Sequence, residues 1–443
     1  MTSFHEQSPR RSRAALVGFI LGGIVLASLA FYLLKAYRFL VVPKQDPYAR
    51  SEIKIYGLSD NPGRRTIAEW EPPGGVLVAY PFQLPFTLLQ EIAHDNSLYV
   101  LVKGASGRGR CLEEWDNHGI DAENISFIQV RQGDGYFYTR DFGPYTVEEK
   151  GQRILVGFLH DYPFSGYDSE AAKIGWLSDA FPLFDARNEN EVPAAVARHF
   201  QVKYEQATIA LTGGAALFDG QGTLFINQLV IDENRAIGID FEEFKGQLIA
   251  HFGVRRLIVL PNYESWGIQH IDCLLKLLDE KRILVKELDS DHPDYERVER
   301  IASGLSAIES PDGSPYQVLR IRTPDYVEGE AAPYINSLIL GAKILVPLMG
   351  IPGDAEAIAT WQAAAPGYEV TGYELGDPAR DRRATADYYF RIYFRLGRRL
   401  VVPWTYTDAL HCRTKSLFLR RTTHKIALGP GRCEPYSLHR ITS

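Results

Sequence analysis

Short apolar and β-branched runs recur along the chain and predict strands. Runs of about four to eight such residues, bounded by turn residues, are typical of strands buried in a sheet. Several of them stop at a proline, as at Pro81, Pro261, Pro347 and Pro403. The predicted strands are 76–80, 98–102, 125–130, 154–159, 257–260, 283–285, 318–321, 344–346 and 400–402.

Segments with apolar residues at helical spacing lie between these runs. They predict helices at 85–96, 191–200, 241–252, 271–280, 292–308 and 354–365. A hairpin turn is predicted at Asp219-Gly220-Gln221-Gly222, because glycine tolerates the positive φ that such turns require. The mixture indicates an α/β fold, and the irregular recurrence of strand and helix units is compatible with a propeller of ββαβ units.

The N-terminus differs in kind from the rest. Residues 14–34 carry no charge, and as a helix they would span about 30 Å, which matches a bilayer core. We therefore expect a basic tail at 1–13, a transmembrane anchor at 14–34, a linker at 35–65 and one domain at 66–443. A cleaved signal peptide is the alternative. Basic residues flank the segment on both sides and leave its orientation open, but a start of the signal-anchor type favours an extracytoplasmic domain.

Composition narrows the function classes. A balance of 45% hydrophobic and 23% charged residues is that of a globular protein, and the formal net charge of −7 argues against a nucleic-acid partner. The four cysteines, Cys111, Cys273, Cys412 and Cys433, are too few and too spread for a disulfide scaffold or a Cys-x-x-Cys zinc site. Phosphate-loop, zinc-protease and serine-hydrolase motifs are absent from the sequence.

Candidate chemistry centres on Cys412. A cysteine nucleophile needs a group that moves protons, and His270 in His270-Ile271-Asp272 can supply one. A second carboxylate is Asp141, in Arg140-Asp141-Phe142-Gly143-Pro144. Two carboxylates beside a thiol suit a planar cation such as a guanidinium. The residues therefore indicate a cysteine hydrolase that acts on arginine-like groups.

Each of these residues also has a plain structural interpretation. Cys412 alone resembles a small buried hydrophobe, and Asp141 a turn aspartate. His270 alone could be a loop histidine, and Asp272 the N-cap of a helix that follows it.

The other cysteines and His411 receive no catalytic role. On a strand, His411 points away from its neighbour Cys412, so we do not expect it to be the base. Adjacent His411 and Cys412 also suit one metal centre poorly, so no metal is expected. Cys111, Cys273 and Cys433 are interpreted as structural.

Six motifs then occur in one order along the chain, and together they resemble the agmatine deiminase and bacterial-type peptidylarginine deiminase family. The likeness extends from about Thr66 to the C-terminus. The motifs are Ala68-Glu69-Trp70-Glu71-Pro72, Arg140-Asp141-Phe142-Gly143-Pro144, Thr212-Gly213-Gly214 with the Asp219 to Thr223 turn, His270-Ile271-Asp272, Tyr334-Ile335-Asn336 and His411-Cys412.

The resemblance implies the pentein fold, a five-bladed α/β propeller of ββαβ units. It implies hydrolysis of a guanidine, in peptidylarginine, agmatine or a related compound, to a ureido group and ammonia without metal or cofactor. Cys412 falls on the family's nucleophile and His270 on its general acid/base. Asp141 and Asp272 fall on the carboxylates that grip the guanidinium, and Asn336, Gly213 and Gly214 on further substrate-site positions.

The sequence departs from both branches of the family. Thr212 stands where the agmatine branch has a carboxylate, and 159–168 contains no arginine of the kind that binds a terminal carboxylate in the peptidylarginine branch. Asp408 near the cysteine could reach a second amine of a substrate. An amidinotransferase on the same fold and a catalytically silent, membrane-tethered binding module remain the alternative functions.

Overall fold

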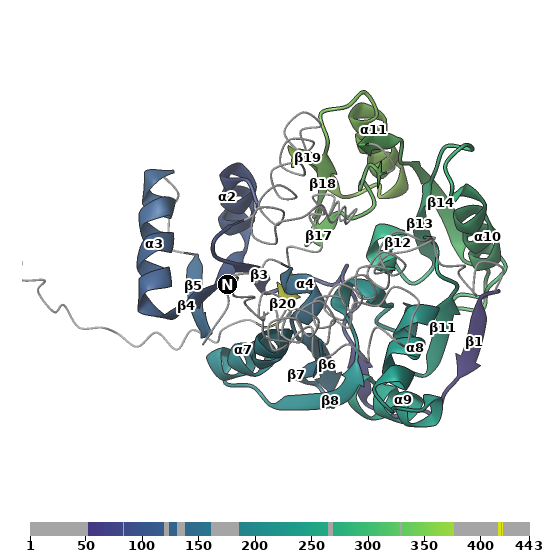
Figure 1. Ribbon diagram of the computed structural model, residues 1–443, viewed down its shortest axis with the longest axis horizontal. Helices are drawn as coiled ribbons and strands as arrows, with labels where there is room; N and C mark the ends of the chain where they lie inside the picture. Colours follow the sequence, from purple (N-terminus) through teal and green to yellow (C-terminus); the bar gives the residue numbers. More distant parts are fainter. Residues whose placement is uncertain are drawn as a thin grey trace, which may run out of the picture.

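The computed structural model describes residues 52–82, 84–118, 124–130, 138–160, 186–264, 269–327, 330–375, 415–417 and 419. Within these residues the chain forms five sheets of three or four strands and one two-stranded ribbon. Most of the longer helices lie around the outside of the molecule, whereas β12 (Leu275–Leu277), β17 (Leu338–Leu340) and β20 (Lys415–Leu417) lie nearer its middle (Figure 1). The fold is mixed α/β, as the sequence predicts.

All five sheets share one connectivity. Each sheet has an inner strand, which pairs antiparallel with the neighbouring strand, here called the middle strand. After the middle strand the chain passes through a helix to a further strand, which pairs parallel with the middle strand on its opposite edge. In one sheet, inner β9 (Ala216–Phe218) precedes middle β10 (Thr223–Asn227). Helices α8 (Gln228–Ala236) and α9 (Phe241–Gln247) then lead to β11 (Arg256–Leu260), which lies parallel to β10.

The other sheets repeat this unit. Their inner strands are β6 (Tyr145–Glu149), β12 (Leu275–Leu277), β17 (Leu338–Leu340) and β20 (Lys415–Leu417). Their middle strands are β7 (Gln152–Leu159), β13 (Arg282–Glu287), β18 (Lys343–Leu348) and β3 (Gly75–Ala79). The crossover helices are α7 (Val192–Phe200), α10 (Tyr295–Ser306), α11 (Asp354–Ala364) and α2 (Phe86–Asp95). They lead to β8 (Tyr204–Ala210), β14 (Gln317–Arg322), β19 (Glu369–Glu374) and β4 (Ser97–Lys103).

Further elements extend this frame. Strands β1 (Lys54–Gly57) and β2 (Arg64–Thr66) add antiparallel edges to the sheets of β11 and β6. Helix α3 (Gly104–Asn117) leads to β5 (Ile125–Val130), which pairs parallel with β4. A small ribbon joins β15 (Asp325–Val327) to β16 (Glu330–Ala331).

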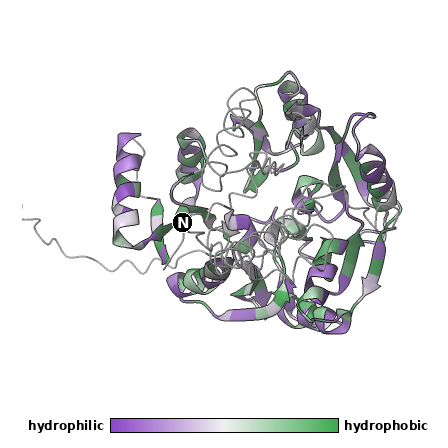
Figure 2. Cartoon of the chain, in the orientation of Figure 1, coloured by the Kyte–Doolittle hydropathy of each residue, from purple (hydrophilic) through white to green (hydrophobic). Residues whose placement is uncertain are grey.

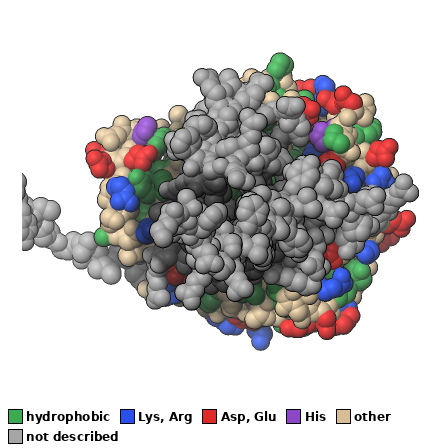
Figure 3. All heavy atoms as spheres, viewed as in Figure 1, with side chains coloured by type: hydrophobic (Ala, Val, Ile, Leu, Met, Phe, Trp, Pro, Cys, Tyr) green, Lys and Arg blue, Asp and Glu red, His purple; other side chains and the backbone are tan. Residues whose placement is uncertain are grey.

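Middle strands are apolar on both faces because they are covered on both faces. Every residue of β3 and β10 is buried, as expected for strands between helices and a core. The strands carry most of the apolar residues and the helices show polar outer faces (Figure 2). Around the rim of the face in Figure 3, acidic and basic side chains are interspersed rather than gathered by sign.

Most predicted elements are confirmed within a few residues, and the hairpin turn is one of them. Gly220 and Gly222 have φ of 72° and 90°, and the Asp219 carboxylate accepts hydrogen bonds from the amides of Gln221 and Thr223 at 2.7 and 2.8 Å. The predicted strand 400–402 lies outside the described residues.

The helix predicted at 271–280 is wrong. The chain makes one 3₁₀ turn, η5 (Ile271–Cys273), and then β12, which pairs with β13. The leucines have helical spacing, but pairing with β13 buries Leu275 and Leu277 on an inner strand. Tertiary pairing therefore overrides the local pattern.

The predicted tail at 1–13, anchor at 14–34 and most of the linker at 35–65 lie outside the described residues. Of the helices that the structure describes, none has the length and apolarity needed to cross a membrane.

Candidate active site

Asp141 lies on a short helical turn that is fixed to a middle strand. This turn is α4 (Thr139–Phe142), which precedes β6. The Thr139 hydroxyl donates to the carbonyl of Leu77 on β3 at 2.9 Å. The turn is closed by the amide of Gly143, which donates to the carbonyl of Thr139 at 2.9 Å. These contacts hold the Asp141 side chain in the interior, where 1% of the residue is exposed.

Two glycines allow the backbone to approach this turn closely. Gly213 and Gly214 begin the 3₁₀ turn η3 (Gly213–Ala215). A Cβ on Gly213 would lie 1.8 Å from the carbonyl oxygen of Arg140, and a Cβ on Gly214 would lie 2.6 Å from Nδ1 of His270. Larger residues do not fit here. The amide of Gly214 is also hydrogen-bonded to the Asp141 carboxylate.

His270 is held by the loop that precedes η5. Gln269 has a φ of 56°, and its side-chain oxygen accepts the amide of Tyr263 at 3.0 Å. The Tyr263 hydroxyl donates to the carbonyl of His270, also at 3.0 Å. His270 is thereby buried with its Nδ1 3.7 Å from Oδ1 of Asp141. The histidine and the aspartate, 129 positions apart in sequence, thus form one site.

Asp272 and Asn336 complete the buried polar group, and both are fully buried. The Asn336 amide nitrogen lies 3.3 Å from the backbone oxygen of Asp272 and 3.3 Å from Sγ of Cys273. The Cys273 thiol in turn lies 3.6 Å from Oδ1 of Asp272. Asn336 therefore fixes the backbone that carries Asp272.

Burial makes the Asp141 carboxylate costly to ionise. Desolvation raises the pKa of Asp141 well above its ordinary value, and the Asp272 carboxylate raises it further. The Gly214 hydrogen bond and Arg140 oppose this shift. Two buried carboxylates that repel each other favour a cationic ligand between them.

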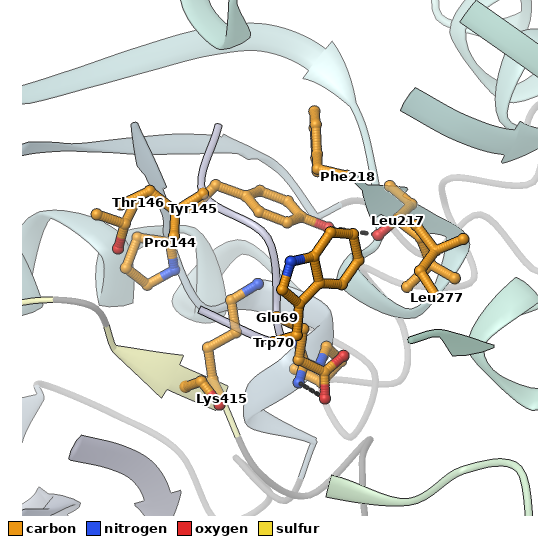
Figure 4. A pocket seen from close by; sticks show the side chains of 13 residues that line it. Glu69, Trp70, Pro144, Tyr145, Thr146, Leu217, Phe218, Leu277 and Lys415 are labelled. Atoms are coloured by element: carbon orange, nitrogen blue, oxygen red, sulfur yellow. Dashed lines mark hydrogen bonds and ion pairs between the residues drawn. The ribbon is translucent and has the colours of Figure 1, made fainter. Parts of the chain in front are cut away.

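A cavity of about 40 Å³ lies beside Arg140, the neighbour of Asp141 in the chain. It is lined among others by Glu69, Trp70, Tyr145 and Lys415 (Figure 4). Glu69 takes part in two ion pairs. Nζ of Lys276 lies 3.2 Å from each of its carboxylate oxygens, and Nη2 of Arg140 lies 3.8 Å from one of them. Burial lowers the pKa of Lys276, although Glu69 opposes the change.

We call six of these charged residues the central cluster. Three are acidic and three are basic. Electrostatic interactions among them shift the pKa values of Asp141, Lys276 and Lys415. They are Glu69, Asp141, Asp272, Arg140, Lys276 and Lys415.

The structure thus brings together six of the seven predicted site residues, namely Asp141, His270, Asp272, Asn336, Gly213 and Gly214. The seventh, Cys412, lies outside the described residues, as do His411 and Asp408. Cys273, predicted to be structural, is in contact with the site, whereas burial raises the pKa of the Cys111 thiol to about 12.

Sequence reasoning missed Lys276 and Lys415. One signal was available for Lys276, since it stands between leucines in a strongly apolar run. For Lys415 the only signal was its position three residues after Cys412. In the described ranges, no cluster of histidine, cysteine and acidic residues is arranged to hold a metal ion.

Comparison with known proteins gives consistent relatives. The agmatine deiminase of Medicago truncatula is 22% identical over 353 residues, which are 69% of this chain and 90% of the relative. The solved agmatine deiminase of Enterococcus faecalis superposes with a TM-score of 0.58 at 18% identity, covering 81% of this chain and 96% of that one. The C. jejuni agmatine deiminase gives 0.55 at 17% identity, covering 80% and 96%. At such identities the structural likeness shows a shared fold.

The family follows from a direct sequence match. Residues 65–380 match the family described as Porphyromonas-type peptidyl-arginine deiminase, and this range includes Asp141, His270, Asp272 and Asn336. The matched range covers well over half of the chain. The chain therefore belongs to the Porphyromonas-type peptidyl-arginine deiminase family.

Proposed function

We propose that this protein hydrolyses a guanidine to a ureido group and ammonia through a covalent intermediate on Cys412. The observation that carries the proposal is the burial of Asp141 and Asp272 beside His270, in a chain that belongs to a deiminase family. A bound guanidinium places a positive charge beside these two buried carboxylates. Its planar N–H groups match carboxylate oxygens in pairs.

The reaction divides into two steps. In the first, the Cys412 thiolate attacks the central guanidinium carbon while Asp141 and Asp272 hold the plane of the group. His270 gives a proton to one nitrogen, the C–N bond breaks, and ammonia leaves with the bonding pair. In the second step, His270 takes one proton from water and the oxygen attacks the thiouronium carbon. The C–S bond then breaks with its electron pair on sulfur, and the remaining hydroxyl proton passes to the released ammonia or to solvent. The products are the ureido compound and free Cys412.

Chain connectivity supports the role of Cys412. Lys415 on β20 lies opposite Leu77 of β3 and lines the cavity beside Arg140. Cys412 stands three residues before Lys415 in the sequence. Leu77 also accepts the hydrogen bond that anchors the Asp141 turn. The turn that carries Asp141 is thus attached to the same sheet as Lys415.

We further propose that the five sheets close into a pentein propeller. The support is their common ββαβ connectivity and the position of β20, which is the last described strand in sequence and completes the sheet of β3, β4 and β5. Closure of this kind would place all five inner strands around the central cluster.

The substrate we propose is agmatine or an arginine side chain in a peptide. The family description favours peptidylarginine, whereas the relatives above are agmatine deiminases, and a C. jejuni agmatine deiminase has been solved with substrate bound. Thr212, where the agmatine branch has a carboxylate, favours the peptide substrate.

We also propose a membrane-anchored enzyme with its catalytic domain on the extracytoplasmic side. The support is the uncharged segment 14–34 with basic residues before it. Protease added to intact cells should digest the domain, and protection of the domain until the cells are lysed would contradict this orientation.

Turnover by the full-length chain tests the function. Agmatine, free arginine and peptides with internal or C-terminal arginine are offered to the wild type and to Cys412→Ala, and ammonia and ureido product are measured together. We expect equal amounts of both products from one substrate class, and none from the variant. Ammonia release that persists in Cys412→Ala would refute the mechanism. A product that forms only when a second amine is added would indicate amidinotransfer.

A further inference from the structure

Lys415 carries a buried amine that the proposed reaction does not use. Only 2% of the residue is exposed, and its Nζ lies 3.7 Å from the centre of the Tyr145 ring (Figure 4). In the part of the chain that the structure describes, this amine has no hydrogen-bond partner. The lysine stem packs tightly, since a Cβ on Gly143 would lie 2.8 Å from its Cγ.

The three cations of the central cluster are held to different degrees. The Arg140 guanidinium lies with its Nη2 3.8 Å from a Glu69 carboxylate oxygen. The Lys276 ammonium lies 3.2 Å from both Glu69 oxygens and donates to the carbonyl of Ser337 at 2.6 Å. Lys415 has the face of a tyrosine ring, a weaker partner for a charge. Lys415 is therefore the cation that can lose its proton at the lowest cost.

Charged groups on several elements shift the pKa of Lys415. Burial lowers its pKa well below the ordinary value, and the Arg140 guanidinium on α4 lowers it further. The carboxylates of Glu69, Asp141 and Asp272 oppose both effects. Among the residues that the structure describes, further charged or titratable groups near these are Lys276 on β12, Tyr145 on β6 and His270, whose ring lies against Asp141. Glu189 also acts on Asp141, and the Cys273 thiol lies beside Asp272.

Without a bound guanidinium, the formal charges of the central cluster balance. Its three carboxylates then face three cations. A guanidinium bound to Asp141 and Asp272 adds a fourth positive charge in a poorly solvated interior, where like charges repel strongly. The arriving guanidinium therefore makes it more costly to keep the Lys415 ammonium charged.

We propose that Lys415 is a positioning residue that releases its proton when the guanidinium binds. In the free protein its ammonium is one of the three positive charges of the central cluster, and the bound guanidinium replaces that charge. One N–H bond of the ammonium then breaks, the electron pair stays on Nζ, and the proton passes to solvent. This inference rests on the proposed function and adds a proton linkage to it. Affinity should rise with pH, by up to about tenfold per pH unit below the pKa of Lys415 in the free protein.

Isothermal titration calorimetry of full-length Cys412→Ala tests the linkage. This background removes the thiol proton and prevents turnover, so that binding alone is measured. Agmatine and a short arginine peptide are titrated in buffers of different ionisation enthalpy at several pH values. The heats give the number of protons exchanged. We expect release of up to one proton per molecule bound, and affinity that rises with pH.

Two substitutions at Lys415 in the same background identify the source of the proton. Lys415→Met removes the charge, so proton release should vanish and the affinity should lose its pH dependence. Lys415→Arg fixes the charge, so release should vanish and binding should weaken roughly tenfold. Lys415→Gln replaces the methionine variant if that chain does not fold.

The contrary results are distinct from one another. Proton release that persists in Lys415→Met would assign it to Asp141 or His270 and overturn the inference. Binding without any release in the Cys412→Ala chain would overturn it as well, and would leave the proposed function standing. Failure of every guanidine to bind would refute the proposed function and the inference together.

Discussion

Two groups of charged residues in this molecule are built in opposite ways. The first, which we call the outer network, consists of Arg64, Glu149, Lys203, Glu205 and His251. Its Glu205 accepts from Nη1 of Arg64 at 2.9 Å, and lies 2.9 Å from Nζ of Lys203 and 3.1 Å from Nδ1 of His251. The hydrogen bond from Arg64 is the main reason that the pKa of Glu205 is lowered to about 2. The second group is the central cluster, where burial raises the pKa of Asp141 and lowers that of Lys415.

The difference shows what each arrangement is suited to do. In the outer network every carboxylate has a cation within hydrogen-bond distance, so both stay charged and hold β2, β6 and β8 together. In the central cluster Glu69 is paired with Lys276, but desolvation opposes the charged forms of the buried Asp141 and Lys415. Such a site stores unfavourable electrostatic energy that a cationic ligand relieves, which is typical of functional sites. The predictions below test this contrast.

The largest expected effect on kcat comes from His270 in the central site, and His251 in the outer network serves as its control. His270→Gln should lower kcat by about 10² to 10⁴, because a positioned acid and base contributes rate of that order. The matched change His251→Gln removes a ring 3.1 Å from Glu205 and should leave kcat unchanged. Steady-state kinetics on one substrate checks both, and an equal loss from the two variants would remove the distinction.

Glycine substitutions test the close approach of the backbone. In Gly214→Ala the new Cβ would overlap the His270 ring, and kcat/KM should fall about 100-fold because the histidine must shift. Gly246→Ala, on α9, meets no atom within 4 Å and should raise the free energy of unfolding by about 0.5 to 1 kcal/mol. Kinetics and denaturant unfolding measure the pair. Unchanged activity in Gly214→Ala would show that His270 does not need its present position.

Asp141→Asn should abolish substrate binding and yet stabilise the fold at neutral pH. The folded-state pKa of Asp141 is raised, so wild-type stability is complete below the ordinary value of 3.8 and falls as pH rises toward the raised value. Asparagine does not ionise, so the variant does not lose this stability as pH rises. Each unit by which the pKa of Asp141 is raised corresponds to about 1.4 kcal/mol. Urea unfolding of both chains across the pH range should show curves that separate as pH rises. A variant that is equally destabilised at every pH would contradict the account.

Glu205→Gln should have a small effect on stability, with a pH dependence opposite to that of Asp141→Asn. The lowered pKa of Glu205 means that its contribution is present above the ordinary value of 4.5 and is lost as pH falls toward about 2. We expect a loss of about 1 kcal/mol near pH 7, since such a partly exposed pair is screened by solvent. The difference from wild type should shrink at low pH, and activity should be unaffected. A loss that grows on acidification would be inconsistent with this interpretation.

The fold was predictable wherever local pattern and tertiary environment agree. The buried runs of β3 and β10 and the amphipathic α10 are of this kind. Helix α3 was not predicted, because its glycines and charges obscure a narrow buried stripe made of Gly107, Cys111 and Trp115. The segment 271–280 has helical spacing, and only its pairing with β13 makes part of it a strand.

The site residues that stand in short sequence motifs could be predicted. Asp141, His270, Asp272 and Asn336 stand in such motifs, and the structure brings them together. The cations Lys276 and Lys415 enter the cluster because strands distant in sequence meet near the middle of the fold. Their importance depends on burial and on what faces them, and neither quantity is contained in the local sequence.

Mass spectrometry after rapid acid quenching tests the central claim most directly. Wild-type chain is mixed with the substrate it turns over, quenched within a fraction of its turnover time and digested to locate any adduct. We predict a substrate-derived amidine bound to Cys412, with the mass of substrate less ammonia, and none in Cys412→Ala. The same adduct on Cys273, whose thiol lies 3.6 Å from Asp272, would contradict the assignment of the nucleophile. Turnover without any adduct would contradict covalent catalysis itself.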